Sequence, residues 1–115
     1  MRSHKLSIKK IICGNMAVSS IEGQIVHQIL DEKLQHDSHI NLDFEGINII
    51  SAAFLNSAIG QLFEKYESVK MRTCISAINT SIQNKLLIKK VIDSSEEYYS
   101  NKEKMDKIIE DVLSL

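Results

Sequence analysis

The segment over residues 39–66 changes its hydrophobic period once, and this change constrains the fold more than any other feature of the sequence. In its first part Ile40, Leu42 and Phe44 alternate with polar residues. A period of two predicts a strand with one buried face. After Ser51 the apolar residues recur every three or four positions, which predicts an amphipathic helix. A strand that leads directly into a helix favours an α/β fold.

The connection between this strand and helix has its own signals. Gly46 follows a glutamate and can adopt the positive φ that a tight turn requires. Ser51 can cap the helix, because its hydroxyl can accept a hydrogen bond from a backbone N–H of the first turn. Between them, Ile47, Ile49 and Ile50 are expected to lie beneath the sheet.

The remaining segments continue the alternation. We expect strands over residues 6–12 and 69–77, and helices over 19–36, 82–92 and 100–113, with a polar break at 94–97. A fourth strand is not evident, and its one candidate is a hairpin within 11–18. Alternating strands and helices require crossover connections. The predicted fold is therefore α/β, with a mainly parallel or mixed sheet of about four strands and amphipathic helices.

The helix expected over residues 19–36 carries three local predictions. Ser19 and Glu22 have the spacing of a capping box. Gly23 costs about 1 kcal/mol in a helix relative to Ala, so its presence indicates close approach to a neighbouring element. His27 and Asp31 lie four residues apart and are expected to pair at the polar edge of the helix.

Length and charge restrict the classes of function. A chain of 115 residues is long enough for one core, so residues 1–115 are expected to form a single domain. The net charge of −1, with only three Phe and three Tyr, argues against a nucleic-acid-binding surface or attraction to an anionic membrane. No apolar run approaches the roughly 20 residues of a membrane span, and no signal peptide is recognisable. The protein is expected to be cytoplasmic.

The cysteines and histidines do not predict a metal site. Cys13 and Cys74 lack a CxxC spacing and are expected to be buried thiols rather than a disulfide. His36, Asp37 and His39 lie close together in sequence, but their spacing matches no zinc ligand set. We therefore expect no metal and no cofactor.

Catalysis is also not expected. Asp43 ends the central strand, at the edge of the sheet where ligand sites of α/β proteins lie. It has no partner base or nucleophile nearby in sequence, and we expect it to accept hydrogen bonds from N–H groups of the following loop. No phosphate-binding glycine loop, nucleophile elbow or metalloprotease motif occurs. A non-enzymatic function is favoured.

Basic residues crowd the third predicted strand and the helix after it, whereas acidic residues dominate the tail. Two alternatives remain open: solvated helix faces, or a docking face for an acidic protein partner. The basic residues are Lys70, Arg72, Lys85, Lys89 and Lys90.

The sequence LDFEGINIIS, followed by a helix that starts with small residues, resembles the core motif of STAS domains. That superfamily includes the bacterial anti-sigma-factor antagonists. Within this superfamily the chain more closely resembles a STAS-like family of uncharacterised bacterial proteins, whose members read roughly LDF-x-G-V-x-x-I-S-x-S-F. The residues that fit this pattern are Leu42, Asp43, Phe44, Gly46, Ile50, Ser51 and Phe54.

The resemblance implies a protein-binding regulatory module, whose partner would be a histidine-kinase-like ATPase of the GHKL type. The alternative is a small-molecule or nucleotide sensor that binds its ligand at the same loop. A homodimer remains open as well. Asn48, Asn56 and Ser57 are expected to be the exposed polar residues of the contact surface. The full set of expected partner-binding residues is Asp43, Gly46, Asn48, Ser51, Ala52, Asn56 and Ser57.

The resemblance also implies that regulation by phosphorylation is weakened in this chain. In the switchable antagonists the phosphoacceptor follows an Asp at the start of the helix. Here Ser51 aligns with that Asp, and Ala52 aligns with the phosphoacceptor. Phosphorylation of Ser51 remains a weaker alternative to its role as the helix cap.

Overall fold

The structure is a computed structural model that describes residues 2–114. A short π-helical turn, η1, joins α3 and α4. The elements, in chain order, are β1 (Arg2–Ser7), α1 (Ile8–Ile12), β2 (Met16–Ala17), α2 (Ser20–Gln35), β3 (Ser38–Asp43), β4 (Ile49–Ile50), α3 (Ala52–Leu55), η1 (Asn56–Gly60), α4 (Leu62–Lys65), α5 (Ser68–Cys74), β5 (Ile75–Ile78) and α6 (Ile82–Leu113).

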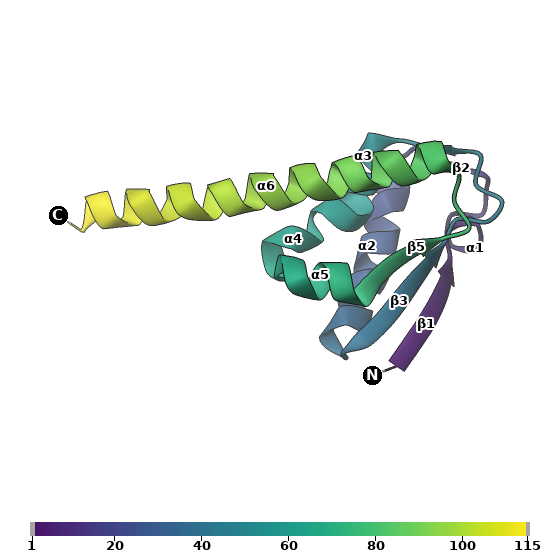
Figure 1. Ribbon diagram of the computed structural model, residues 1–115, viewed down its shortest axis with the longest axis horizontal. Helices are drawn as coiled ribbons and strands as arrows, with labels where there is room; N and C mark the ends of the chain where they lie inside the picture. Colours follow the sequence, from purple (N-terminus) through teal and green to yellow (C-terminus); the bar gives the residue numbers. More distant parts are fainter. Residues whose placement is uncertain (1, 115) are drawn as a thin grey trace.

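Three parallel strands form the main sheet in the order β1–β3–β5, with β3 at the centre (Figure 1). Leu42 of β3 pairs with Leu6 on one side and Ala77 on the other, so these side chains point to the same face. This face carries the core, and Leu42 is fully buried in it. The predicted α/β fold with parallel strands is confirmed, although the main sheet has three strands.

The helices cover the apolar face of the sheet. Helix α2 packs against β3, α3 and η1, and α6 packs against α3, η1 and α4. Figure 1 shows α6 crossing the whole domain and continuing past it, on the side away from β2. The segment α3–η1–α4 therefore lies between α2 and α6, and its residues Phe54, Leu55, Ile59 and Leu62 are buried.

A second, two-stranded sheet replaces the expected hairpin. Strand β2 falls within residues 11–18, but it pairs in parallel with β4, with Met16 opposite Ile49 and Ala17 opposite Ile50. The hairpin prediction was wrong. The N–H of Gly14 donates to the carbonyl oxygen of Lys9 at the turn after α1. After this turn β2 pairs with β4 and not with β1.

The expected first strand ends early, at Ser7. The Oγ of Ser7 accepts a hydrogen bond from the N–H of Lys10 at 3.2 Å, which starts helix α1. Ile8 and Ile12 lie four residues apart and are both buried, as helical spacing requires. The prediction of a strand up to residue 12 was wrong, because the apolar residues at 8, 11 and 12 fit both periods.

The expected third strand is a helix over most of its length. Met71 and Cys74, which lie three residues apart, face the core from α5, while Val69 and Thr73 are exposed. Of the predicted strand, only the part that falls in β5 is extended. The prediction of a strand over 69–77 was wrong in its first six residues. The alternation of Val69, Met71, Thr73 and Ile75 suggested a strand, whereas the structure follows the helical spacing of Met71 and Cys74.

Helix α6 is continuous through the expected break. Ser95 is buried against Gly60 of η1, and Glu96 forms an ion pair with Arg72. Within 94–97, Ser95 thus packs in a close contact with η1, while Ser94 and Glu97 face solvent. The helix continues through Ser100, where a new helix was expected to begin. The cap at Ser81 starts α6, since its Oγ accepts from the N–H of Asn84 at 3.1 Å.

Side-chain predictions in α2 and at the cysteines had mixed outcomes. The Oγ of Ser19 caps α2, as expected, by accepting from the N–H groups of Ile21 and Glu22. Asp31 does not pair with His27; it accepts from the hydroxyl of Tyr66 at 2.6 Å and forms an ion pair with Lys65 at 3.0 Å. Both cysteines are free thiols, and the one at position 74 is buried as expected, whereas the one at position 13 is exposed.

The close approach expected at Gly23 is confirmed. A Cβ at this position would lie 2.6 Å from the carbonyl oxygen of Phe54 and 2.8 Å from the Cβ of Ser57. Glycine is therefore what allows α2 to pack directly on the backbone of α3 and η1.

We predict that Gly23→Ala destabilises the domain. Ala normally stabilises a helix by about 1 kcal/mol relative to Gly, but here the overlap with α3 should cost more, giving a net loss of about 1–3 kcal/mol. The control is Gly14→Ala, where an added Cβ meets nothing within 4 Å. Urea unfolding measures both variants. Equal stability of Gly23→Ala and wild type would contradict the contact.

Candidate functional site

The expected partner-binding residues lie at the end of β3, in the loop that follows it, at the start of α3 and in η1. Ser51 fastens this region at two points. Its Oγ accepts from the N–H of Phe54 at 3.1 Å, which caps α3, and donates to the carbonyl oxygen of Val18 at 2.9 Å. The expected cap is confirmed, and the second bond ties α3 to the segment that follows β2.

Asp43 stabilises the start of the loop that follows β3. Its buried carboxylate accepts from the side-chain amide of Asn79 at 2.9 Å and from the N–H of Glu45 at 3.0 Å, and Lys5 lies 3.6 Å away. The Asn79 bond, followed by the bond from Glu45, lowers the pKa of Asp43 below its ordinary value. Asp43 therefore acts within the loop as expected.

The middle of the loop is held by its backbone. Gly46 adopts a φ of +81°, which confirms the expected turn, and the side chain of Lys9 lies over it. The N–H of Asn48 donates to the carbonyl oxygen of Asn15 at 2.8 Å. These contacts join the loop to the turn before β2, so the loop has a defined shape.

The structure brings only some of the predicted residues to the surface. Asn48, Ala52 and Asn56 are exposed, and Ser51 is half-buried. Ser57 is buried, and its Oγ donates to the carbonyl oxygen of Ser20 at 2.7 Å. The prediction that Ser57 is exposed was wrong, because α3 and η1 are packed between two helices and have no wide solvent-facing side.

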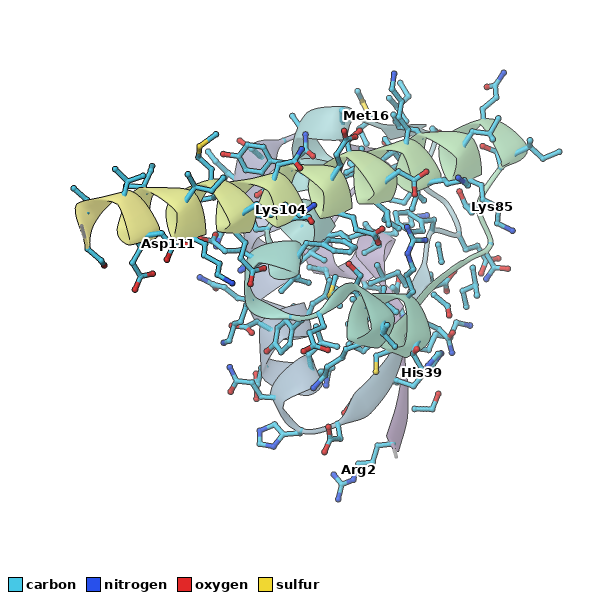
Figure 2. The ribbon with its side chains drawn as sticks, turned by 60° about the vertical axis from the view of Figure 1, so that its left-hand side comes forward. Arg2, Met16, His39, Lys85, Lys104 and Asp111 are labelled. Atoms are coloured by element: carbon cyan, nitrogen blue, oxygen red, sulfur yellow. The ribbon has the colours of Figure 1, made fainter. Side chains whose placement is uncertain are left out.

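Four exposed apolar side chains lie on segments next to this region, and the sequence reasoning missed their exposure. Met16 and Ile49 are paired across the small sheet, so their side chains point the same way. Val18 follows β2, and Ile21 lies in the first turn of α2. All four are between 37% and 76% exposed. We call this set, Met16, Val18, Ile21 and Ile49, the apolar patch; Figure 2 shows Met16 on the outside of the domain.

The apolar patch corrects one expectation, because Ile49 is 51% exposed and does not lie beneath the main sheet. Ile21 likewise lies outside the buried face of α2, which consists of Gly23, Val26, Leu30 and Leu34. The alternation of Met16 and Val18 around the buried Ala17 was the sequence signal that could have found the patch.

A shallow groove of about 600 Å³ lies beside the same region. It runs between α6 and the segment α3–η1, and small side chains form most of its walls. Asn56 and Ser57 line one side, and Ser94, Ser95 and Tyr98 line the other. The groove thus adjoins one exposed residue of the predicted contact surface.

Three of the five clustered basic residues on α5 and the first part of α6, Lys70, Arg72 and Lys89, form ion pairs within the chain. Arg72 donates to Glu96 at 2.9 Å and to Asp93 at 3.0 Å, and Lys89 pairs with Asp93 at 2.8 Å. These pairs neutralise the centre of the cluster and support solvated, internally paired helix faces.

Residues 2–114 contain neither a metal-binding cluster nor a helix that could span a membrane. No group of three or more His, Cys, Asp or Glu side chains is arranged to hold a metal ion. No helix within these residues has both the length and the apolar character that crossing a bilayer requires.

We predict that Ser51→Ala lowers the free energy of unfolding by about 1–2 kcal/mol, because it removes the cap and leaves the carbonyl of Val18 without its donor. Ser51→Asp should also destabilise, since a carboxylate can cap but cannot donate to Val18. Ser51→Thr keeps both bonds and is the control. Thermal melts compare the three; an Asp variant as stable as wild type would rule out the second bond.

The lowered pKa of Asp43 predicts a pH-dependent contribution to stability. The ionised carboxylate stabilises the fold above the pKa of an unfolded Asp, about 4, and this contribution is lost as pH falls through the folded-state pKa. The stability difference between wild type and Asp43→Asn should therefore be largest near neutral pH and shrink in acid. Ser51→Ala, which titrates no group, should show a constant difference. Urea unfolding across pH would contradict the prediction if both differences changed in parallel.

Comparison with known proteins places this sequence in a family. Residues 22–85 match the model of a STAS-like domain of unknown function. The match begins in α2, covers β3, the loop, α3 and β5, and ends at the start of α6. A search of curated proteins found no match, and neither did a search of solved structures. Because the match spans more than half of the sequence, the chain belongs to the family of STAS-like domains of unknown function.

Proposed function

We propose that this chain is a non-enzymatic, protein-binding regulatory module, and that its partner is a histidine-kinase-like ATPase of the GHKL type. The partner docks on the apolar patch and the adjoining start of α3. The observation that carries the proposal is the exposure of Met16, Val18, Ile21 and Ile49 at the edge of the predicted site. Apolar side chains gathered on a surface are typical of protein-binding sites.

The surroundings of the patch fit a protein partner. Asn48 and Asn56 are exposed and supply polar side chains at its margin. Apolar centres with polar rims are the usual composition of protein interfaces. The backbone beneath is held by Ser51 and Asp43, so little order would have to be gained on binding.

Binding in this proposal is not switched at the start of α3. Ala52 carries no hydroxyl, and both hydrogen-bonding functions of Ser51 are used inside the domain. A phosphate on Ser51 would break the bond to Val18 and add nearly two negative charges. Control would then come from the amount of the protein or from the state of its partner.

The test uses a purified GHKL-type ATPase from the same host and measures its affinity for the chain by calorimetry. Met16→Asp and Ile49→Asp should each weaken binding at least about tenfold, a loss of about 1.4 kcal/mol. Val69→Asp is the matched control, because Val69 is 75% exposed on α5, away from the patch. Failure of the wild-type chain to bind, or equal losses in all three variants, would refute the proposal.

A second candidate, a small-molecule or nucleotide sensor, is favoured by the groove beside Asn56. Its volume of about 600 Å³ is within the range of small-ligand sites. Calorimetry with ATP and with GTP tests this candidate. Ser94→Trp would fill the groove from the exposed side of α6 and should abolish binding, whereas Ser94→Ala should preserve it. Binding unaffected by Ser94→Trp would place any ligand elsewhere.

A further inference from the structure

The C-terminal half of α6 extends beyond the domain (Figure 1). Every residue over 100–114 is exposed. Within the described residues, the most C-terminal ion pair between α6 and the rest of the domain joins Lys102 to Glu64 at 3.3 Å. Residues 103–114, the part of the helix described after this point, form no further ion pair with the domain, and Figure 2 shows Asp111 far from the core.

This exposed segment nevertheless carries an apolar stripe. Its large apolar side chains follow the i, i+3, i+4, i+7, i+8 spacing of a buried helix face. Each is at least 50% exposed. A helix of this length without a packed face is marginally stable in water, so the stripe requires a covering surface. The side chains are Met105, Ile108, Ile109, Val112 and Leu113.

We infer that the stripe is covered by the same segment of a second copy of this chain, in an antiparallel helix pair. Tyr98, Met105 and Val112 recur every seven residues, and Asn101 and Ile108 follow three residues after the first two. This is the a and d spacing of a helix pair. In an antiparallel arrangement Met105 lies opposite Ile108 of the second copy, and the polar Asn101 falls at the end nearest the domain.

Charge complementarity supports this occupant and this direction. With Met105 opposite Ile108 of the second copy, Lys104 comes next to Asp111 of the second copy, and the symmetry repeats the pair. Neither residue forms an ion pair with another described residue. A parallel pair would instead require Lys102 to meet Glu97 of the second copy, but Lys102 is already bonded to Glu64. The antiparallel pair also places the two domains at opposite ends of the joined helices.

This inference is independent of the proposed function, since the stripe lies on α6, outside the apolar patch, and beyond the family match over residues 22–85. The two surfaces could be occupied at once. The module would then present two partner-binding patches, one at each end of an elongated dimer.

Sedimentation equilibrium of the full chain tests the inference. Wild type should have twice the chain mass of 13.0 kDa. Ile108→Glu should be a monomer that keeps the domain fold, as checked by a thermal melt. A monomeric wild type at high micromolar concentration, or a dimer that Ile108→Glu leaves intact, would overturn the inference.

Charge reversals test the direction of the pair. Asp111→Lys and Lys104→Asp should each weaken the dimer about tenfold, because two attractive contacts become repulsive. The double variant should regain the wild-type dissociation constant. Glu110→Lys is the matched control, with the same change of charge on the outer side of the helix, and should have no such effect. Two weakened single variants without recovery in the double variant would overturn the antiparallel arrangement.

Discussion

The contact between α2 and the α3–η1 segment is the constraint on which the remaining structure depends. Gly23 lets the two backbones meet, and the hydrogen bond from Ser57 to the carbonyl of Ser20 closes the contact beside it. Before the start of each helix, Ser51 bonds to the carbonyl of Val18. The starts of both helices are therefore fastened together, and β2 and β4 are brought side by side because they lead into those starts.

This arrangement separates the residues that shape the site from those that face solvent. The polar residues that stand out in the sequence, Asp43, Ser51 and Ser57, spend their hydrogen bonds inside the domain. The surface above them is formed by apolar side chains of the small sheet and by Asn48. The polar groups of Asp43, Ser51 and Ser57 are hydrogen-bonded within the domain, and most of the exposed side chains above them are apolar. A surface of this kind is suited to recognition by shape more than by hydrogen bonding.

The sequence predicted the centre of the fold better than its margins. The period change around β3, the caps at Ser19 and Ser51, and the glycine contact were all confirmed, because each depends on neighbours within a few residues or on a single backbone requirement. Errors arose where apolar residues fit two periods at once, as in α1 and α5. Helix α6 continued through 94–97 because Ser95 meets Gly60, a tertiary contact that local pattern cannot reveal.

Reasoning from the sequence predicted only part of the candidate site. The loop and cap residues were found, since turn chemistry and the family pattern point to them. The apolar patch was missed, because Ile21 and Ile49 look like core residues until the packing around them is known. Whether an isoleucine is covered depends on elements more than thirty positions away, such as β4 beside β2.

The pairing of the strands has a consequence for how the chain acquires its structure. Leu6 pairs with Leu42, Met16 with Ile49, and Leu42 with Ala77, so among residues 2–114 no strand pairs with its partner through a short hairpin. Such distant pairings must close long loops before they gain contacts, and this slows the search for the native state. During synthesis on the ribosome β3 would emerge before β5, so the central strand would stay unpaired on one side until residue 78 had left the exit tunnel.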